Sequence, residues 1–173
     1  MGITIDMWFE IASLALTIVG GIFVYFQWKK SVKTKRAEFI HQIIDKLRFD
    51  ENLIKTTYIL DYNQDWYDDS FHNGNNGMEY KIDKFFCYID YICYLRSTRN
   101  ISEKEFKIFN YEVHRICSRS KSAQAYLWNL YHFAQRNKTS YSFRYLIDYG
   151  IENGLFPKDF TTNKNLYRKQ LNF

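Results

Sequence analysis

Few residues of this chain combine the type and the spacing that catalysis requires. The four histidines are His41, His72, His114 and His132, and none stands in a His-x₃-His or Cys-x₂-Cys pattern. His114 and Cys117 are three residues apart, so on a helix the imidazole would lie beside the thiol and could activate it as a nucleophile. No third group that would orient the imidazole is identifiable, and Cys117 continues an apolar stripe. We therefore predict that Cys117 packs in a core.

Acidic side chains gather in one polar stretch, residues 63–77, which contains two Asn-Gly steps. Asp65, Asp68 and Asp69 offer carboxylate oxygens and His72 offers an imidazole nitrogen, which are ligands for a divalent ion. A solvated polar loop explains the same residues, since Asn, Gly and Asp favour turns. We predict a loop that holds no metal ion, and no motif in the chain indicates a cofactor.

A second candidate for chemistry is the pair Arg36 and His41, which stand at the two ends of a six-residue segment. This Arg-x₄-His spacing resembles the motif of HEPN-type ribonucleases, which are also small helical domains. The resemblance implies that the two side chains converge at a dimer interface, where His acts as acid or base and Arg holds phosphate. The family favours a polar residue after the Arg, but Ala37 stands there. A membrane-tethered ribonuclease is therefore the alternative, and a non-enzymatic protein is the prediction.

The element that organises the chain is the apolar stretch from Met7 to Trp28. It is 22 residues long, and Glu10 is its only side chain that is charged at neutral pH. As a helix it would measure roughly 33 Å, enough to cross a bilayer core of about 30 Å. Trp8 and Trp28 lie at its two ends, where amphipathic rings favour the lipid headgroups. We predict that residues 1–28 are a transmembrane anchor.

A basic cluster follows the apolar stretch at once, and it consists of Lys29, Lys30, Lys33, Lys35 and Arg36. The positive-inside rule then places the N-terminus outside and the rest of the chain in the cytoplasm. The cluster can meet anionic membrane lipid, at about 1 kcal/mol for each basic residue near the surface. A cleaved signal peptide is not expected, because basic residues rather than a cleavage site follow the apolar run.

One face of the predicted membrane helix carries small and polar residues: Glu10, Ser13, Thr17, Gly20, Gly21 and Gln27. Ser13, Thr17 and Gly21 form a small-x₃-small series, a spacing that lets two helix backbones approach closely. We predict that this face is a helix–helix interface of a homo-oligomer. The alternative is that Glu10 merely reaches the outer interface and that the small residues have no special role.

The remaining composition describes an ordinary cytosolic domain. From residue 37 onward the chain has 19 basic and 17 acidic residues, so the formal charge of +5 is mostly local and nucleic acid is not an expected partner. The tail, residues 161–173, is mildly basic and is read as solvated. The cysteines are Cys87, Cys93 and Cys117, and we expect buried free thiols in a reducing compartment.

Apolar residues at helical spacing predict an all-α fold. Residues 29–48 form a basic juxtamembrane helix, and residues 49–160 form a domain of five or six helices with a loop at 63–77. Its helices begin near Asp50, at Met78, after Ser102, after Ser120 or Ser122, and near Ser140. Ser102 and Glu105 form a capping box, and Gly154 and Pro157 end the last helix at Glu152. The apolar faces include Tyr58 in the second segment and Phe133 in the helix after Ser120.

This layout, together with the aromatic-rich segment 85–91 and the helix start at Ile101-Ser102, resembles a family of small bacterial single-pass membrane proteins. Their cytosolic helical domain has no known function, and some members accompany anti-phage systems. The resemblance implies a membrane-acting effector in phage defence that oligomerises and binds an unknown cytosolic protein. A plain scaffold that localises a partner enzyme is a further alternative.

Overall fold

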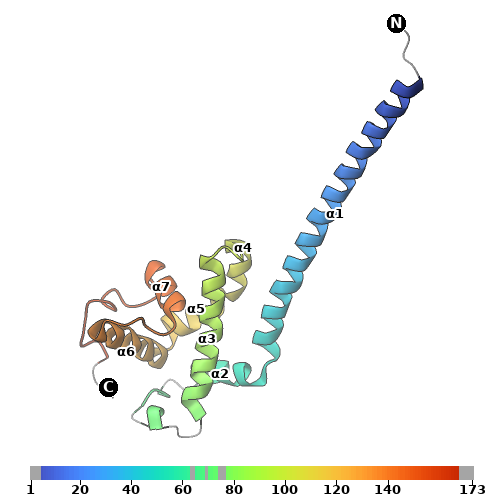
Figure 1. Ribbon diagram of the computed structural model, residues 1–173. Coiled ribbons are helices and arrows are strands. Elements are labelled where there is room, and N and C mark those ends of the chain that lie inside the picture. Colours follow the sequence, from blue (N-terminus) through green and yellow to red (C-terminus); the bar gives the residue numbers. More distant parts are fainter. Residues whose placement is uncertain (1–4, 63–64, 69, 74–76, 168–173) are drawn as a thin grey trace. The chain divides into compact units, whose positions relative to one another are not determined.

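The computed structural model describes residues 5–62, 65–68, 70–73 and 77–167, and the regular secondary structure of these residues is helical, with no β-strand (Figure 1). The all-α prediction is therefore confirmed for the described part. Asp69 of the acidic stretch, and Arg168 and Lys169 of the basic tail, lie outside it. The chain separates into two compact units, residues 1–46 and residues 47–173.

Helix α1 runs without interruption from Ile5 to Phe49. The expected continuation of the apolar helix through the basic segment is therefore confirmed. The helix contains no proline, and Gly20 and Gly21 do not break it, since its hydrogen bonds continue through both. The hydroxyl of Thr17 donates to the carbonyl of Ser13 over 2.9 Å, which keeps that polar group satisfied within the helix.

Within the described residues, six α-helices follow α1, in agreement with the five or six predicted. They are α2 (Glu51–Tyr62), α3 (Met78–Ser97), α4 (Glu103–Phe106), α5 (Asn110–His114), α6 (Lys121–Asn137) and α7 (Arg144–Glu152). Short 3₁₀ turns lie at Phe71–Asn73 and Lys107–Phe109, and a π turn spans Arg115–Arg119.

Helix α3 is the centre of this second unit. Its inward residues Ile82, Phe85, Phe86, Ile89 and Ile92 have no exposed surface, and α3 contacts α2, α4 and α7. Figure 1 shows α3 in green with α7 beside it. The helical stripe predicted for Met78–Thr98 is thus the stripe that builds the core.

Local capping signals are confirmed. Ser102 accepts from the backbone N–H of Glu105, whose carboxylate accepts in return from the N–H of Ser102 over 2.7 Å. Ser120 caps α6 by accepting from the N–H of Ala123 over 3.2 Å. Gly154 has φ +62, and the N–H of Leu155 bonds the carbonyl of Gly150, which closes α7 in a Schellman motif.

Other expectations were wrong. The last helix begins at Arg144 instead of Ser140, because Phe143 takes a left-handed conformation with φ 55°. Tyr58 and Phe133, both assigned to apolar faces, are exposed, Phe133 to 43%. Cys87 is exposed, whereas Cys93 and Cys117 are buried free thiols as predicted.

The acidic stretch is not simply solvated. Trp66, Tyr67 and Phe71 are all less than 5% exposed. Their rings pack on Tyr126 of α6, with Phe71 and Tyr67 centroids 5.1 and 5.3 Å from it. Trp66 also meets the edge of Phe86 on α3 at 6.5 Å. The loop is therefore anchored to the core by its aromatic residues, while Asp65 and Asp68 face solvent.

Candidate functional site

The predicted pair of His114 and Cys117 is not arranged for nucleophilic chemistry. Cys117 has no exposed surface, and burial raises the pKa of its thiol well above the ordinary value. His114 is exposed, and its Nδ1 lies 3.4 Å from the hydroxyl of Ser118. The prediction that Cys117 packs in the core is confirmed.

The acidic stretch makes local hydrogen bonds. Asp68 accepts from the N–H and the hydroxyl of Ser70 at 2.9 and 2.6 Å, and these bonds lower the pKa of Asp68. His72 places Nδ1 2.9 Å from a carboxylate oxygen of Glu79 on α3. In the part of the chain that the structure describes, no three His, Cys, Asp or Glu side chains are grouped as metal ligands would be.

Arg36 and His41 both lie exposed on α1. The imidazole Nε2 of His41 is 3.2 Å from a carboxylate oxygen of Asp45, one helical turn further on. Convergence of Arg36 and His41 across a dimer stays a hypothesis.

The predicted helix–helix face is exposed along its whole length. Glu10, Ser13, Thr17, Gly20 and Gly21 all present surface on α1. A Cβ atom built on Gly20 or Gly21 would meet no atom within 4 Å outside the local helix, so the backbone there is open to close approach. The basic cluster is exposed as well, and its members are Lys29, Lys30, Lys33, Lys35 and Arg36.

A groove of about 250 Å³ lies between the C-terminal half of α3 and helix α7. Its lining residues are Cys93, Arg96, Ser97, Arg144, Tyr145, Asp148, Tyr149 and Glu152. The guanidinium of Arg96 lies 4.7 Å from the ring centroid of Tyr149 and 5.5 Å from that of Phe106. Its Nε is 2.9 Å from a carboxylate oxygen of Glu103. Two rings and one carboxylate therefore hold this cation in place.

Polar groups on α7 complete the groove. Asp148 accepts a short hydrogen bond from the hydroxyl of Tyr141 and lies 3.4 Å from Nε of Arg144. Burial is the main cause that raises the pKa of Tyr149, while the charge of Arg96 opposes it. The phenol of Tyr149 thus stays protonated and can donate a hydrogen bond.

Three exposed tyrosines gather at the groove: Tyr145 lines it, and Tyr91 and Tyr94 continue the surface beside it. Tyr91 and Tyr94 stack on α3 with centroids 6.4 Å apart, and Tyr94 meets Tyr145 of α7 edge-on at 5.0 Å. Each ring is more than one third exposed. Large aromatic rings that remain exposed and mutually held are typical of binding surfaces.

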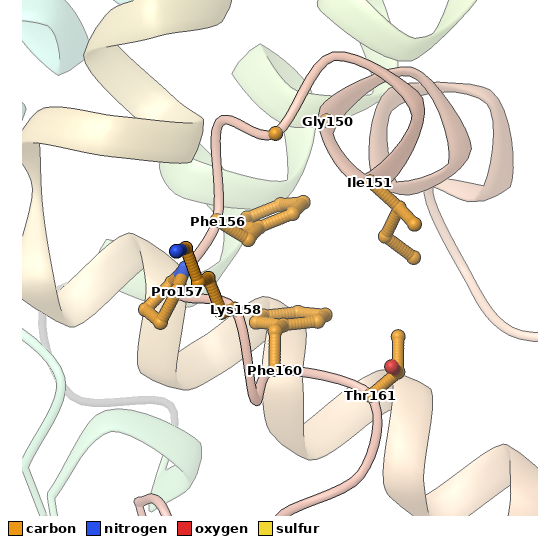
Figure 2. A pocket seen from close by; sticks show the side chains of 8 residues that line it. Gly150, Ile151, Phe156, Pro157, Lys158, Phe160 and Thr161 are labelled. Carbon is orange, nitrogen blue, oxygen red and sulfur yellow. The ribbon is translucent and has the colours of Figure 1, made fainter.

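A second pocket, of about 210 Å³, lies where the chain leaves α7 (Figure 2). Its floor is the stacked pair Phe156 and Phe160, with centroids 4.1 Å apart, and Ile151 and Thr161 face each other across it. The ring of Phe156 approaches the backbone of Gly150 so closely that a Cβ there would lie 2.9 Å from Cδ2. Among the residues that line this pocket, Lys158 is the only charged one.

A half-buried polar cluster joins α3 and α6. The hydroxyl of Tyr126 donates to Asp83 over 2.8 Å, and the amide of Asn129 donates to the hydroxyl of Tyr67 over 2.7 Å. Desolvation raises the pKa of Asp83, and it raises the pKa of Tyr67 to about 12. The hydrogen bond from Asn129 to Tyr67 holds the anchored loop against α6.

Sequence reasoning did not find the groove. Arg96 stands inside an aromatic-rich helix, and Arg144 follows the left-handed Phe143, so neither belongs to a recognisable motif. The only available signal was the density of tyrosines in residues 88–94.

Comparisons of the chain with protein families, with curated proteins and with solved structures found no significant match.

Proposed function

We propose that this chain is a single-pass membrane protein whose helical domain lies in the cytoplasm and binds a protein partner. The observation that carries the proposal is that α1 is strongly apolar and exposed. Its most apolar 18-residue window has a mean hydropathy of 1.9, and none of that window is buried. A soluble protein rarely exposes so large an apolar surface, whereas a lipid bilayer covers it.

The flanking residues support the same anchor. Trp8 and Trp28 are exposed at the two ends of the apolar segment, at the depth of the headgroups. The exposed basic cluster follows Trp28 directly, which supports a cytoplasmic location for everything after it. Anionic lipid is the expected contact of that cluster.

Association of the membrane helix with a second copy is part of the proposal. Gly20 and Gly21 leave the α1 backbone open on one face, and Ser13 and Thr17 add small side chains to it. Helices in lipid associate through close packing, because lipid is as apolar as their side chains.

The particular role we propose is that of a non-enzymatic, membrane-acting effector. The tyrosines and arginines at the α3–α7 groove have the composition of a binding surface, while the Cys117 thiol is buried and His41 pairs with Asp45. The resemblance to anchored bacterial proteins that accompany anti-phage systems supports a role in phage defence.

Cysteine labelling in intact cells tests the topology. In a Cys87→Ser background, Thr4→Cys and Lys158→Cys place one thiol on each side of the apolar segment. A membrane-impermeant maleimide should label only the cysteine at position 4, and both positions after lysis. Labelling at position 158 in intact cells, or recovery of the chain in the soluble fraction, would overturn the proposal.

A further inference from the structure

The outer face of α3 carries exposed residues at heptad spacing. Tyr80, Cys87 and Tyr94 follow one another at intervals of seven residues, and Tyr91 lies four residues after Cys87. All four are exposed, Tyr80 to 68%. At about 100° per residue these positions fall within about 60° of one another, so they form one straight stripe along the helix. We call these four residues the tyrosine stripe.

The tyrosine stripe contains no charged residue, which distinguishes it from an ordinary solvated helix face. The charged side chains Lys84 and Asp90 border it on its two sides, and both are already engaged. Lys84 bonds Asp50 over 3.1 Å, and Asp90 accepts from the backbone N–H of Leu146 over 2.8 Å. An uncharged stripe at a spacing of seven residues is the pattern by which one helix packs along another.

The size of this surface indicates what covers it. Tyr145 of α7 meets Tyr94 edge-on at 5.0 Å and adds its ring to the stripe. Tyr91, Tyr94 and Tyr145 are between 37% and 44% exposed, so with Tyr80 the exposed rings amount to about two whole tyrosine side chains, roughly 400 Å². A stable complex of free proteins buries about 800 Å² on each partner. The stripe therefore fits a contact that is weak alone and is supported by a second link between the partners.

A second copy of the chain supplies such a link. The proposed association through α1 holds two copies in one membrane, which raises the effective concentration of each domain for the other. A heptad stripe can also pair with itself about a twofold axis, since the rings of one helix enter the spaces between those of the other. A partner that has no membrane link gains no such advantage.

We propose that the tyrosine stripe, together with Tyr145, is the surface through which two copies of the helical domain pair. The inference rests on the proposed membrane anchoring and self-association of α1, and it adds a second contact outside the membrane. Cys87 lies halfway between Tyr80 and Tyr94. The two α3 helices therefore bring their Cys87 thiols near each other whether they pair in parallel or antiparallel.

Cross-linking of the full chain in membranes isolated from expressing cells tests this inference. Of the three cysteines, Cys87 alone is exposed, so a short bismaleimide reports on the stripe. The parent should give a covalent dimer. Tyr91→Lys places like charges opposite each other and should lower the dimer yield at least about tenfold. Tyr91→Phe keeps the ring and should leave the yield unchanged.

Two further variants serve as matched controls. Phe133→Lys introduces the same charge at an aromatic residue of α6 that is exposed to nearly the same extent as Tyr91 but lies outside the stripe, and it should keep the parent yield. Cys87→Ser combined with Gln135→Cys moves the thiol to an exposed position on α6 and should give little dimer.

A parent that forms no dimer, an equal yield from the Gln135→Cys chain, or an unchanged yield in Tyr91→Lys would overturn the inference. A cross-link to a different protein in place of the dimer would overturn it as well. Unfolding midpoints, measured in parallel, separate lost pairing from lost folding. Alkaline extraction of the same membranes tests the anchor separately. A chain released by this extraction refutes the anchor, whereas a chain that stays in the membrane without a dimer refutes the stripe alone.

Discussion

The carboxylate of Asp90, in the middle of α3, accepts a hydrogen bond over 2.8 Å from the backbone N–H of Leu146, in the first turn of α7. The residue that precedes α7 is Phe143. Its backbone takes a left-handed conformation, and its side chain makes no capping hydrogen bond. The cap of α7 therefore comes from another helix. This contact ties the first turn of α7 to α3 beside the groove, in addition to the packing between the two helices.

Removing that cap should destabilise the domain. Asp90→Ala leaves the first-turn N–H groups of α7 without their acceptor and should lower the free energy of unfolding by about 1 to 2 kcal/mol. Asp90→Asn keeps an acceptor oxygen and should cost less. Denaturant titration in detergent, followed by circular dichroism, measures both. Glu152→Ala, at an exposed position on α7, is the control, and an equal effect of Glu152→Ala and Asp90→Ala would contradict the role of the cap.

The raised pKa of Asp83 makes the stability of the folded domain depend on pH. Desolvation raises its pKa above the ordinary 3.8, so the folded state binds its proton more tightly than the unfolded chain does. The contribution of Asp83 to stability is then fully present below that ordinary pKa and is lost as the pH rises through the raised pKa of the folded state.

Asp83→Asn should remove this pH dependence, because an amide oxygen still accepts from Tyr126 and carries no charge. The variant should match the parent near the ordinary pKa of Asp83 and should be at least as stable as the parent at neutral pH. Unfolding midpoints of the two chains across that pH range test the prediction. A parent-minus-variant difference that is independent of pH, or that grows in favour of the parent with rising pH, would refute it.

What the sequence predicted correctly depended on neighbours along the chain. Ser102 and Glu105 form their capping box within one turn, and Phe85, Phe86 and Ile89 define a helix face by spacing alone. In such patterns, the residues that form the cap or the helix face lie within a few positions of one another in the sequence. They predicted the helical fold, most element boundaries and the long apolar α1.

What the sequence did not predict depended on residues far apart. Trp66 and Tyr67 lie among Asn and Asp, which favour turns, and only the rings of Tyr126 and Phe86 explain why they are buried. The cap from Asp90 to Leu146 crosses 56 positions. The groove arises in the same way, since its two arginines come from helices that pair only in the folded unit.

Position 150 must be glycine because the ring of Phe156 packs directly against its backbone. A methyl group at this position would lie 2.9 Å from Cδ2 and nearer still to Cε2, and Phe160 stacks behind the ring. Gly150→Ala should therefore cost about 1 to 3 kcal/mol of stability, as overpacked cores do.

Phe156→Leu in the same chain provides a rescue, because the smaller side chain leaves room for the methyl group. The double variant should lose less stability than the sum of the two single losses, by unfolding midpoint. Strict additivity would show that the close approach of Phe156 is not what position 150 must accommodate.

The last prediction concerns the proposed helix–helix face of α1. Gly21 lies on the face that also carries Ser13 and Thr17, and the Thr17 hydroxyl is already bonded to the carbonyl of Ser13. Association through this face, as proposed, would depend on close backbone approach more than on hydrogen bonds between helices. Gly21→Ile places a branched side chain where a Cβ meets open space, which would push a second helix away.

Ile22→Leu is the matched control, since it lies about 100° around the helix and conserves volume. Both variants should still insert, because the segment stays apolar. Oligomer size in detergent, together with a two-helix reporter in a bacterial inner membrane, should show association lost in Gly21→Ile and retained in Ile22→Leu. If Gly21→Ile associates as well as the parent, the small-residue face is not an interface, and α1 acts as an anchor alone.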